Sequence, residues 1–148
     1  MKGKDILRLI PQRKPFIMVD EATNFTEVSC NTYLSIGYNN YFVVGDDELS
    51  ETGLIEHMAQ SASVLAGYKS LFLSEEGGED RANSNAAPPV GIIGEVKRFN
   101  CHRRPLVGER LETTIRFGLT FGNVTLADGE CRIGDELIAD IKLKIFIE

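Results

Sequence analysis

A carboxylate and an imidazole stand side by side in the segment Glu51–Ser63, among residues that are mostly apolar or small. The pattern over residues 52–73 predicts one long helix, on which Glu56 and Gln60 share a narrow polar stripe. The rest of that helix is apolar, which is typical of a buried helix. A buried ionisable side chain must be paired, neutralised or functional, so Glu56 is the first candidate for acid–base chemistry.

Several other segments would have to position this helix. Ser50 or Thr52 is expected to cap its N-terminus, and a short helix is predicted over residues 4–10. The apolar run 16–19 predicts the start of a buried strand, and residues 74–89 predict a mobile surface loop. Alternating apolar and polar residues predict further strands at 30–38, 111–121, from 124 onward and 137–147, with turns at Gly122-Asn123 and Gly134-Asp135.

These elements predict an α+β fold with five or six mostly antiparallel strands and one long helix. A single sheet can bury a helix that is apolar nearly all round only by curling around it. The helix flank that the sheet leaves uncovered would then need another subunit. Residues 1–148 show no internal repeat, and we expect one domain.

Composition narrows the function classes. The formal net charge of −6 argues against a general nucleic-acid binder. No apolar run approaches the roughly 20 residues that span a bilayer, and the N-terminus lacks a secretory signal, so we expect a cytoplasmic protein without a membrane segment. Cys30, Cys101 and Cys131 have no paired spacing, so neither a disulfide framework nor a zinc site is expected. No nucleotide loop or metal-ligand spacing occurs, and no cofactor is expected.

Three segments carry a resemblance to a known family. They are residues 10–20, the helix start Glu56-His57-Met58-Ala59-Gln60, and residues 91–111, which contain Lys97-Arg98-Phe99, Arg104-Pro105-Leu106 and Val107-Gly108-Glu109-Arg110-Leu111. In this order they resemble the 3-hydroxyacyl-[acyl-carrier-protein] dehydratases of fatty-acid synthesis, whose helix carries a Glu-Ala-Met-Ala-Gln signature. Within that superfamily the chain is most similar to the variants associated with aryl-polyene and flexirubin-type pigment synthesis.

The resemblance implies a hotdog fold, in which the sheet wraps the long helix and two subunits join their sheets. It also implies active sites at the subunit interface and dehydration of a 3-hydroxyacyl thioester to a trans-2-enoyl thioester. Glu56 matches the family's catalytic carboxylate and would protonate the departing hydroxyl. The family's catalytic histidine lies in a His-Phe-Pro-Gly segment, but the corresponding residues 42–49 contain no histidine and are about two residues shorter.

The remaining candidates each have a structural alternative. His57 is the weaker catalytic candidate, since consecutive helical side chains diverge by about 100° and could meet in one pocket only across a two-fold interface. The alternative is a neutral histidine with a structural or surface role. Gly53 and Leu54 could offer N–H donors to a thioester oxygen, with Gln60 lining the same site. Alternatively, Gly53 only permits close backbone packing.

A basic cluster follows the predicted loop in an otherwise acidic chain. It contains Lys97, Arg98, Arg103, Arg104 and Arg110. Such a cluster suits docking of an acidic acyl carrier protein and its phosphopantetheine arm. Alternatively, these side chains protect a solvated strand edge. His102 lies within the cluster and is expected at the surface.

Three functions therefore remain open. The first is a dimeric 3-hydroxyacyl-[acyl-carrier-protein] dehydratase. The second, favoured by the missing loop histidine, is a catalytically silent hotdog subunit that binds acyl chains or pairs with an active dehydratase. The third is an acyl-thioester hydrolase in which Glu56 activates water.

Overall fold

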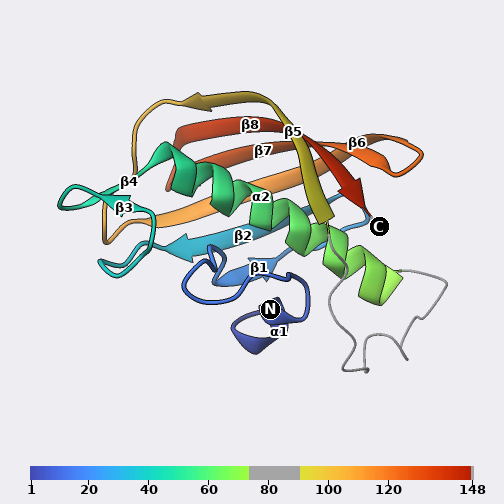
Figure 1. Cartoon of the computed structure of the whole chain (residues 1–148), viewed down its shortest axis with the longest axis horizontal. Coiled ribbons are helices and arrows are strands. Elements are labelled where there is room, and N and C mark those ends of the chain that lie inside the picture. The colour runs from blue at the N-terminus through green and yellow to red at the C-terminus, as the bar shows by residue number, and fades with distance from the viewer. Residues whose placement is uncertain (74–90, 148) are drawn as a thin grey trace.

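A curved sheet wraps one long helix in the computed structural model, which describes residues 1–73 and 91–147 (Figure 1). Within these ranges the main sheet has six strands in the order β1-β2-β6-β7-β8-β5, and every neighbouring pair is antiparallel. The strands are β1 (Glu21–Thr23), β2 (Ser29–Ser35), β5 (Gly91–Cys101), β6 (Arg110–Phe121), β7 (Val124–Ile133) and β8 (Glu136–Ile147). A separate short ladder joins β3 (Val43–Val44) and β4 (Glu48–Leu49). The predicted hotdog arrangement is confirmed.

The long helix α2 comprises Glu51–Tyr68 and continues as a π-helical turn, η1, over Lys69–Leu73. The predicted helix over 52–73 is therefore confirmed. Ser50 caps it, because its Oγ accepts a hydrogen bond from the Gly53 N–H at 3.1 Å. Every residue from 57 to 67 is buried, so the sheet and the N-terminal segment enclose the helix on most sides.

The strand patterns place the core on the concave face of the sheet. In β6 the buried residues alternate with exposed ones as far as Phe117, as the sequence predicts, whereas Leu119 and Phe121 are exposed. The predicted turns are also confirmed, with Gly122 at φ 62° and Gly134 at φ 58°, conformations that suit glycine. Inward-facing residues from the strands pack on Leu54, Met58 and Leu65 of the helix.

The N-terminal segment differs from the prediction. Helix α1 comprises only Lys4–Leu7, although Leu9 and Ile10 are still fully buried against α2. The expected strand start at 16–19 is wrong, because side chains of α2 bond this backbone in place of a neighbouring strand. The loop predicted over 74–89 lies outside the described residues. No helix in the described ranges is long and apolar enough to cross a membrane.

Candidate active site

Glu56 projects from the second turn of α2 and is half-buried. The Gln60 Nε2 atom, one turn further along, donates to Glu56 Oε1 at 2.8 Å. The same Nε2 donates to the Phe16 carbonyl at 2.6 Å, and Gln60 Oε1 accepts from the Met18 N–H at 2.7 Å. Both hydrogens of the Gln60 amide are thus used, so its orientation is fixed and it holds one oxygen of the Glu56 carboxylate. The structure brings these two candidates together.

His57 lies in the core, with no exposed surface in the described chain. Its Nδ1 is 2.7 Å from the Met18 carbonyl oxygen, which can only accept, so Nδ1 carries the proton. Its Nε2 therefore accepts from the Thr113 hydroxyl at 2.8 Å. Burial lowers the pKa of His57 to about 4, against the raising effect of the Met18 hydrogen bond, so the ring is neutral at ordinary pH. This geometry gives no support to the expected catalytic role and favours the structural alternative.

The backbone N–H groups at the start of α2 already have hydrogen-bond acceptors within the chain. The Gly53 N–H donates to Ser50 Oγ, and the Leu54 N–H donates to the Ser50 carbonyl at 3.0 Å. A Cβ atom added at Gly53 would lie 2.6 Å from Phe42 Cβ, closer than such atoms approach. The structure therefore favours close packing as the role of Gly53, and both amides are bound to Ser50 rather than directed at a ligand.

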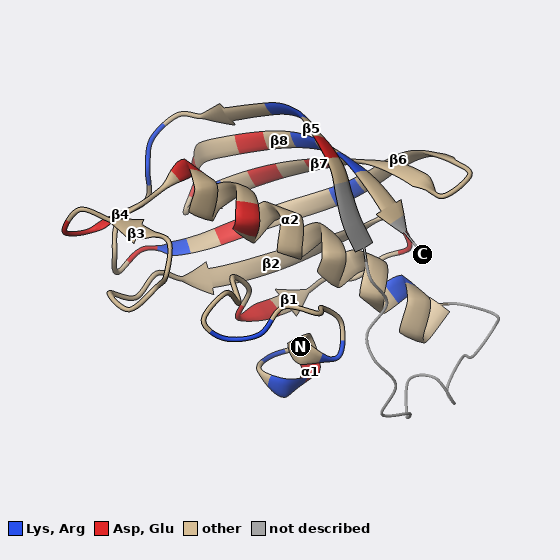
Figure 2. Cartoon of the chain, in the orientation of Figure 1, with Lys and Arg blue, Asp and Glu red and all other residues tan. Residues whose placement is uncertain are grey.

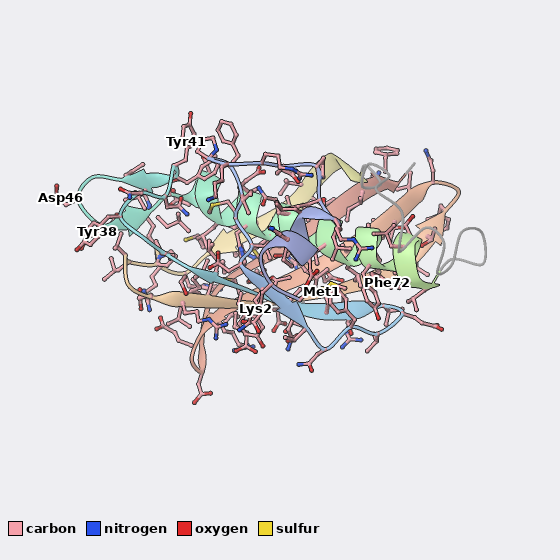
Figure 3. The ribbon with its side chains drawn as sticks, turned by 90° about the horizontal axis from the view of Figure 1, so that it is seen from below. Met1, Lys2, Tyr38, Tyr41, Asp46 and Phe72 are labelled. Atoms are coloured by element: carbon pink, nitrogen blue, oxygen red, sulfur yellow. The ribbon has the colours of Figure 1, made fainter. Side chains whose placement is uncertain are left out.

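A cluster of aromatic side chains that includes Phe16 is the feature near the site that the sequence did not predict. Phe16, whose carbonyl binds Gln60, packs edge-on against Tyr41 with ring centroids 4.9 Å apart, and Tyr41 packs edge-on against Phe42 at 5.2 Å. Phe16 is 44% exposed and Tyr41 is 61% exposed. Tyr41 projects outward near the β3–β4 end of the molecule (Figure 3). The available signal for these side chains in the sequence was the aromatic pair Tyr41-Phe42, which directly precedes β3 in a short segment rich in turns.

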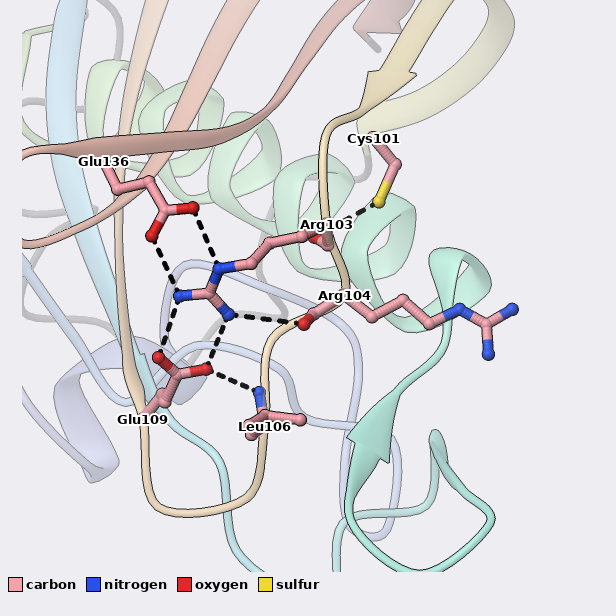
Figure 4. Close-up of polar contacts among 6 residues, drawn as sticks. All are labelled: Cys101, Arg103, Arg104, Leu106, Glu109 and Glu136. Carbon is pink, nitrogen blue, oxygen red and sulfur yellow. Dashed lines mark hydrogen bonds and ion pairs between the residues drawn. The ribbon is translucent and has the colours of Figure 1, made fainter.

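Figure 2 shows basic residues on β5 and on the chain that follows it, and some of them form closer ion pairs than others. Arg103 forms ion pairs with Glu109 at 2.8 Å and Glu136 at 2.9 Å (Figure 4). Arg104 forms them with Glu51 at 2.7 Å and Glu48 at 3.4 Å. These arginines therefore fasten the chain after β5 to the sheet and to the start of α2. Lys97 and Arg98 lie exposed on β5, and Arg98 approaches Asp140 at 3.6 Å.

His102 shares Asp140 with Arg98, and two surface pockets lie away from the predicted site residues. His102 is at the surface, as expected, where its Nε2 lies 3.3 Å from Asp140 Oδ2. A pocket of about 390 Å³ lies between α1 and residues 14–20, and another of about 300 Å³ is lined by polar residues of β6 and β7. Neither is lined by a predicted site residue. The described residues include no cluster of three or more metal-ligating side chains.

Removal of the Glu109 carboxylate is expected to reduce stability at neutral pH but not in acid. The Arg103 guanidinium holds the pKa of Glu109 below its usual value of 4.5, with help from the Leu106 N–H and against partial burial. A lowered folded-state pKa gives stability that is present above 4.5 and lost as the pH falls through the lowered value. Glu109→Gln should therefore cost about 1 kcal/mol at pH 7. Urea unfolding at pH 7 and pH 3 checks this, and an equal cost at both pH values would contradict it.

Comparison with known proteins identifies the family of this chain. Residues 4–148 match the family model described as "ApeP-like: ApeP dehydratase". The chain belongs to the ApeP-like dehydratase family. The resemblance to dehydratases seen in the sequence is thereby confirmed. The Glu56–Gln60 pair is therefore part of a protein of a dehydratase family.

The relatives agree in length and architecture. The chain is 29% identical to the 3-hydroxyacyl-[acyl-carrier-protein] dehydratase FabZ of Sulfurimonas denitrificans, over 97% of this chain and 94% of that protein. It is 26% identical to FabZ of Wolinella succinogenes over 96% of this chain and 92% of that protein. Among solved structures it is similar to the dehydratase heterocomplex ApeI:P from Xenorhabdus doucetiae, with a TM-score of 0.80, 16% identity, and coverage of 97% of this chain and 90% of that chain. The last likeness supports the fold alone.

Proposed function

We propose that this protein dehydrates a 3-hydroxyacyl thioester carried by an acyl carrier protein, giving the trans-2-enoyl thioester and water. The observation that carries the proposal is the Glu56 carboxylate, half-buried on α2 and held by Gln60 at 2.8 Å. Glu56 and Gln60 match the Glu-Ala-Met-Ala-Gln signature that this helix start resembles, and the FabZ relatives are 3-hydroxyacyl-[acyl-carrier-protein] dehydratases.

Glu56 supplies the acid in this mechanism. A base removes the proton from the carbon next to the thioester carbonyl, and that carbon–hydrogen electron pair forms the new double bond. The carbon–oxygen bond at the 3-position breaks, and protonated Glu56 gives its proton to the departing hydroxyl, which leaves as water. Gln60 aims the carboxyl by occupying one of its oxygens.

A second subunit would supply the base. Within the described residues, His57 is enclosed in the core and His102 lies at the surface against Asp140. Two features support assembly with another hotdog subunit, identical or different. In the part of the chain that the structure describes, β5 pairs with β8 only and forms an edge of the sheet. The aromatic residues Phe16 and Tyr41 pack together and are exposed, and the Phe16 carbonyl accepts from the Gln60 amide that holds Glu56.

Two alternatives predict different products. A thioester hydrolase would release the free acid, and a silent subunit would give no product unless an active partner were added. The test incubates purified protein with a 3-hydroxyacyl-carrier substrate, alone and with a FabZ-type subunit, and separates enoyl thioester from free acid by mass. Enoyl product that depends on this chain and is lost when Glu56→Gln replaces it supports the proposal. Free acid, or the same enoyl yield without this chain or with its Glu56→Gln variant, would overturn it.

Reversal of the exposed charges on β5 is expected to weaken use of the carrier-bound substrate. Lys97 and Arg98 are exposed, whereas Arg103 and Arg104 hold two carboxylates each. We therefore expect Lys97→Glu/Arg98→Glu to raise KM for the carrier-bound substrate by about tenfold at low salt. KM for the same acyl group on free pantetheine should be unchanged, which serves as the control. Equal KM values for wild type and variant on the carrier substrate would refute docking at this strand.

A further inference from the structure

The backbone of residues 16–18 is held to α2 by side chains rather than by a neighbouring strand. The Phe16 carbonyl and the Met18 N–H both bond the Gln60 amide, at 2.6 and 2.7 Å. The Met18 carbonyl accepts from His57 Nδ1 at 2.7 Å. His57 and Gln60 are three residues apart on the helix and therefore face the same side, so together they hold both polar groups of the Met18 backbone.

The imidazole is itself fixed on its far side. Thr113 in β6 donates its hydroxyl to His57 Nε2 at 2.8 Å, which prevents the ring from turning and sets the proton on Nδ1. Ser61 donates to the His57 carbonyl at 2.7 Å and receives a hydrogen bond from Thr32 in β2 at 2.6 Å. These contacts are all buried, so the ring has one orientation with both nitrogens satisfied.

The Met18 backbone links His57 to the carboxylate. Gln60 can donate to Glu56 only while its amide keeps the orientation that Phe16 and Met18 impose. Loss of the donor at His57 would leave the buried Met18 carbonyl without a partner, and the segment would have to move to find one. A displacement of about 1 Å at such a distance from the reacting atoms can cost a hundredfold in rate.

We infer that His57 is a positioning residue, which aims the Glu56 carboxylate through the Met18 backbone and the Gln60 amide without itself exchanging a proton with the substrate. The inference rests on the proposed function and adds to it. It assigns a role to a histidine that the family signature does not contain, since Ala occupies that place in the Glu-Ala-Met-Ala-Gln pattern.

Two amide substitutions at position 57 test the inference as a matched pair. His57→Asn places its amide nitrogen near the position of Nδ1, where it can still donate to Met18. His57→Gln carries the amide farther out, toward Thr113, and leaves Met18 without its donor. We expect His57→Asn to keep kcat within about threefold of wild type and His57→Gln to lower kcat by about 30-fold or more, with KM nearly unchanged in both. Equal kcat values for the two variants would overturn the inference, whether both are high or both are low.

A control variant separates the positioning role of His57 from a general effect on protein stability. A second readout tests that role independently of the proposed function. Thr125→Val removes a buried hydroxyl of β7, which bonds Thr120 at 3.1 Å, without touching His57, Gln60 or residues 16–18, so its kcat should equal that of wild type even if its Tm falls. Hydrogen exchange at the Met18 amide needs no turnover. It should be about tenfold faster in His57→Gln than in wild type and His57→Asn. Unchanged protection would overturn the positioning role even if dehydration were demonstrated, and the exchange result stands even if no dehydration occurs.

Discussion

Glu56→Gln is expected to lower the rate of dehydration by about 10³-fold without changing the fold. Glutamine has nearly the same shape and can still bond Gln60, but it has no acidic proton to give to the departing hydroxyl. KM should change little, because the acyl chain and carrier contacts remain. Initial rates of enoyl thioester formation, measured in the assembly that shows wild-type activity, check the result.

Glu112→Gln provides a matched control for this substitution. Glu112 is an exposed carboxylate on the outer face of β6, so it has the same chemistry on the side of the sheet that faces away from α2. Its variant should have the wild-type rate. A Glu56→Gln protein with more than about a tenth of the wild-type rate would show that another group supplies the proton.

Gly67→Ala is expected to reduce the free energy of unfolding by about 2 kcal/mol, although alanine is the better helix former. A Cβ atom at this position would lie 2.9 Å from Leu9 Cα and 3.0 Å from the Leu9 carbonyl carbon. These are backbone atoms, and Leu9 is fully buried, so neither side can yield as a flexible side chain would. Urea unfolding should detect the change as a lower midpoint with the same slope.

Gly118→Ala tests whether the loss comes from this contact. An added Cβ there would meet its nearest atom, the Leu126 carbonyl oxygen, at 3.8 Å, which is an ordinary contact distance. We expect a change within about 0.5 kcal/mol for that variant. If Gly67→Ala were as stable as wild type, the close contact between Gly67 and the Leu9 backbone would be contradicted.

Local patterns were sufficient to predict much of the fold. The alternation in β6 and the glycine turn at Gly122 predicted the hairpin, and Ser50 predicted the start of α2, because each signal acts over a few residues. The same reasoning failed at residues 16–19. An apolar run there predicts a strand, but its backbone is bonded by Gln60, a side chain 42 residues away from Met18.

The candidate site depends more strongly on distant residues. Glu56 and Gln60 could be paired from their spacing of four along a helix. The partners of His57 could not be predicted, because Met18 and Thr113 are 39 and 56 residues away in the chain. The same holds for Arg104, which the sequence assigned to carrier docking and which bonds Glu51, 53 residues away. Residue type and spacing along the chain carry no information about such partners.

A crystal structure of the assembled protein with a 3-hydroxyacyl pantetheine amide, a non-hydrolysable analogue of the proposed substrate, tests the central claim most directly. The account predicts the Glu56 carboxyl within about 3.2 Å of the hydroxyl on the 3-carbon. It also predicts Gln60 still bonded to the other carboxyl oxygen, and the acyl chain enclosed between subunits. An analogue bound away from α2, with the Glu56 carboxylate in open solvent, would contradict it.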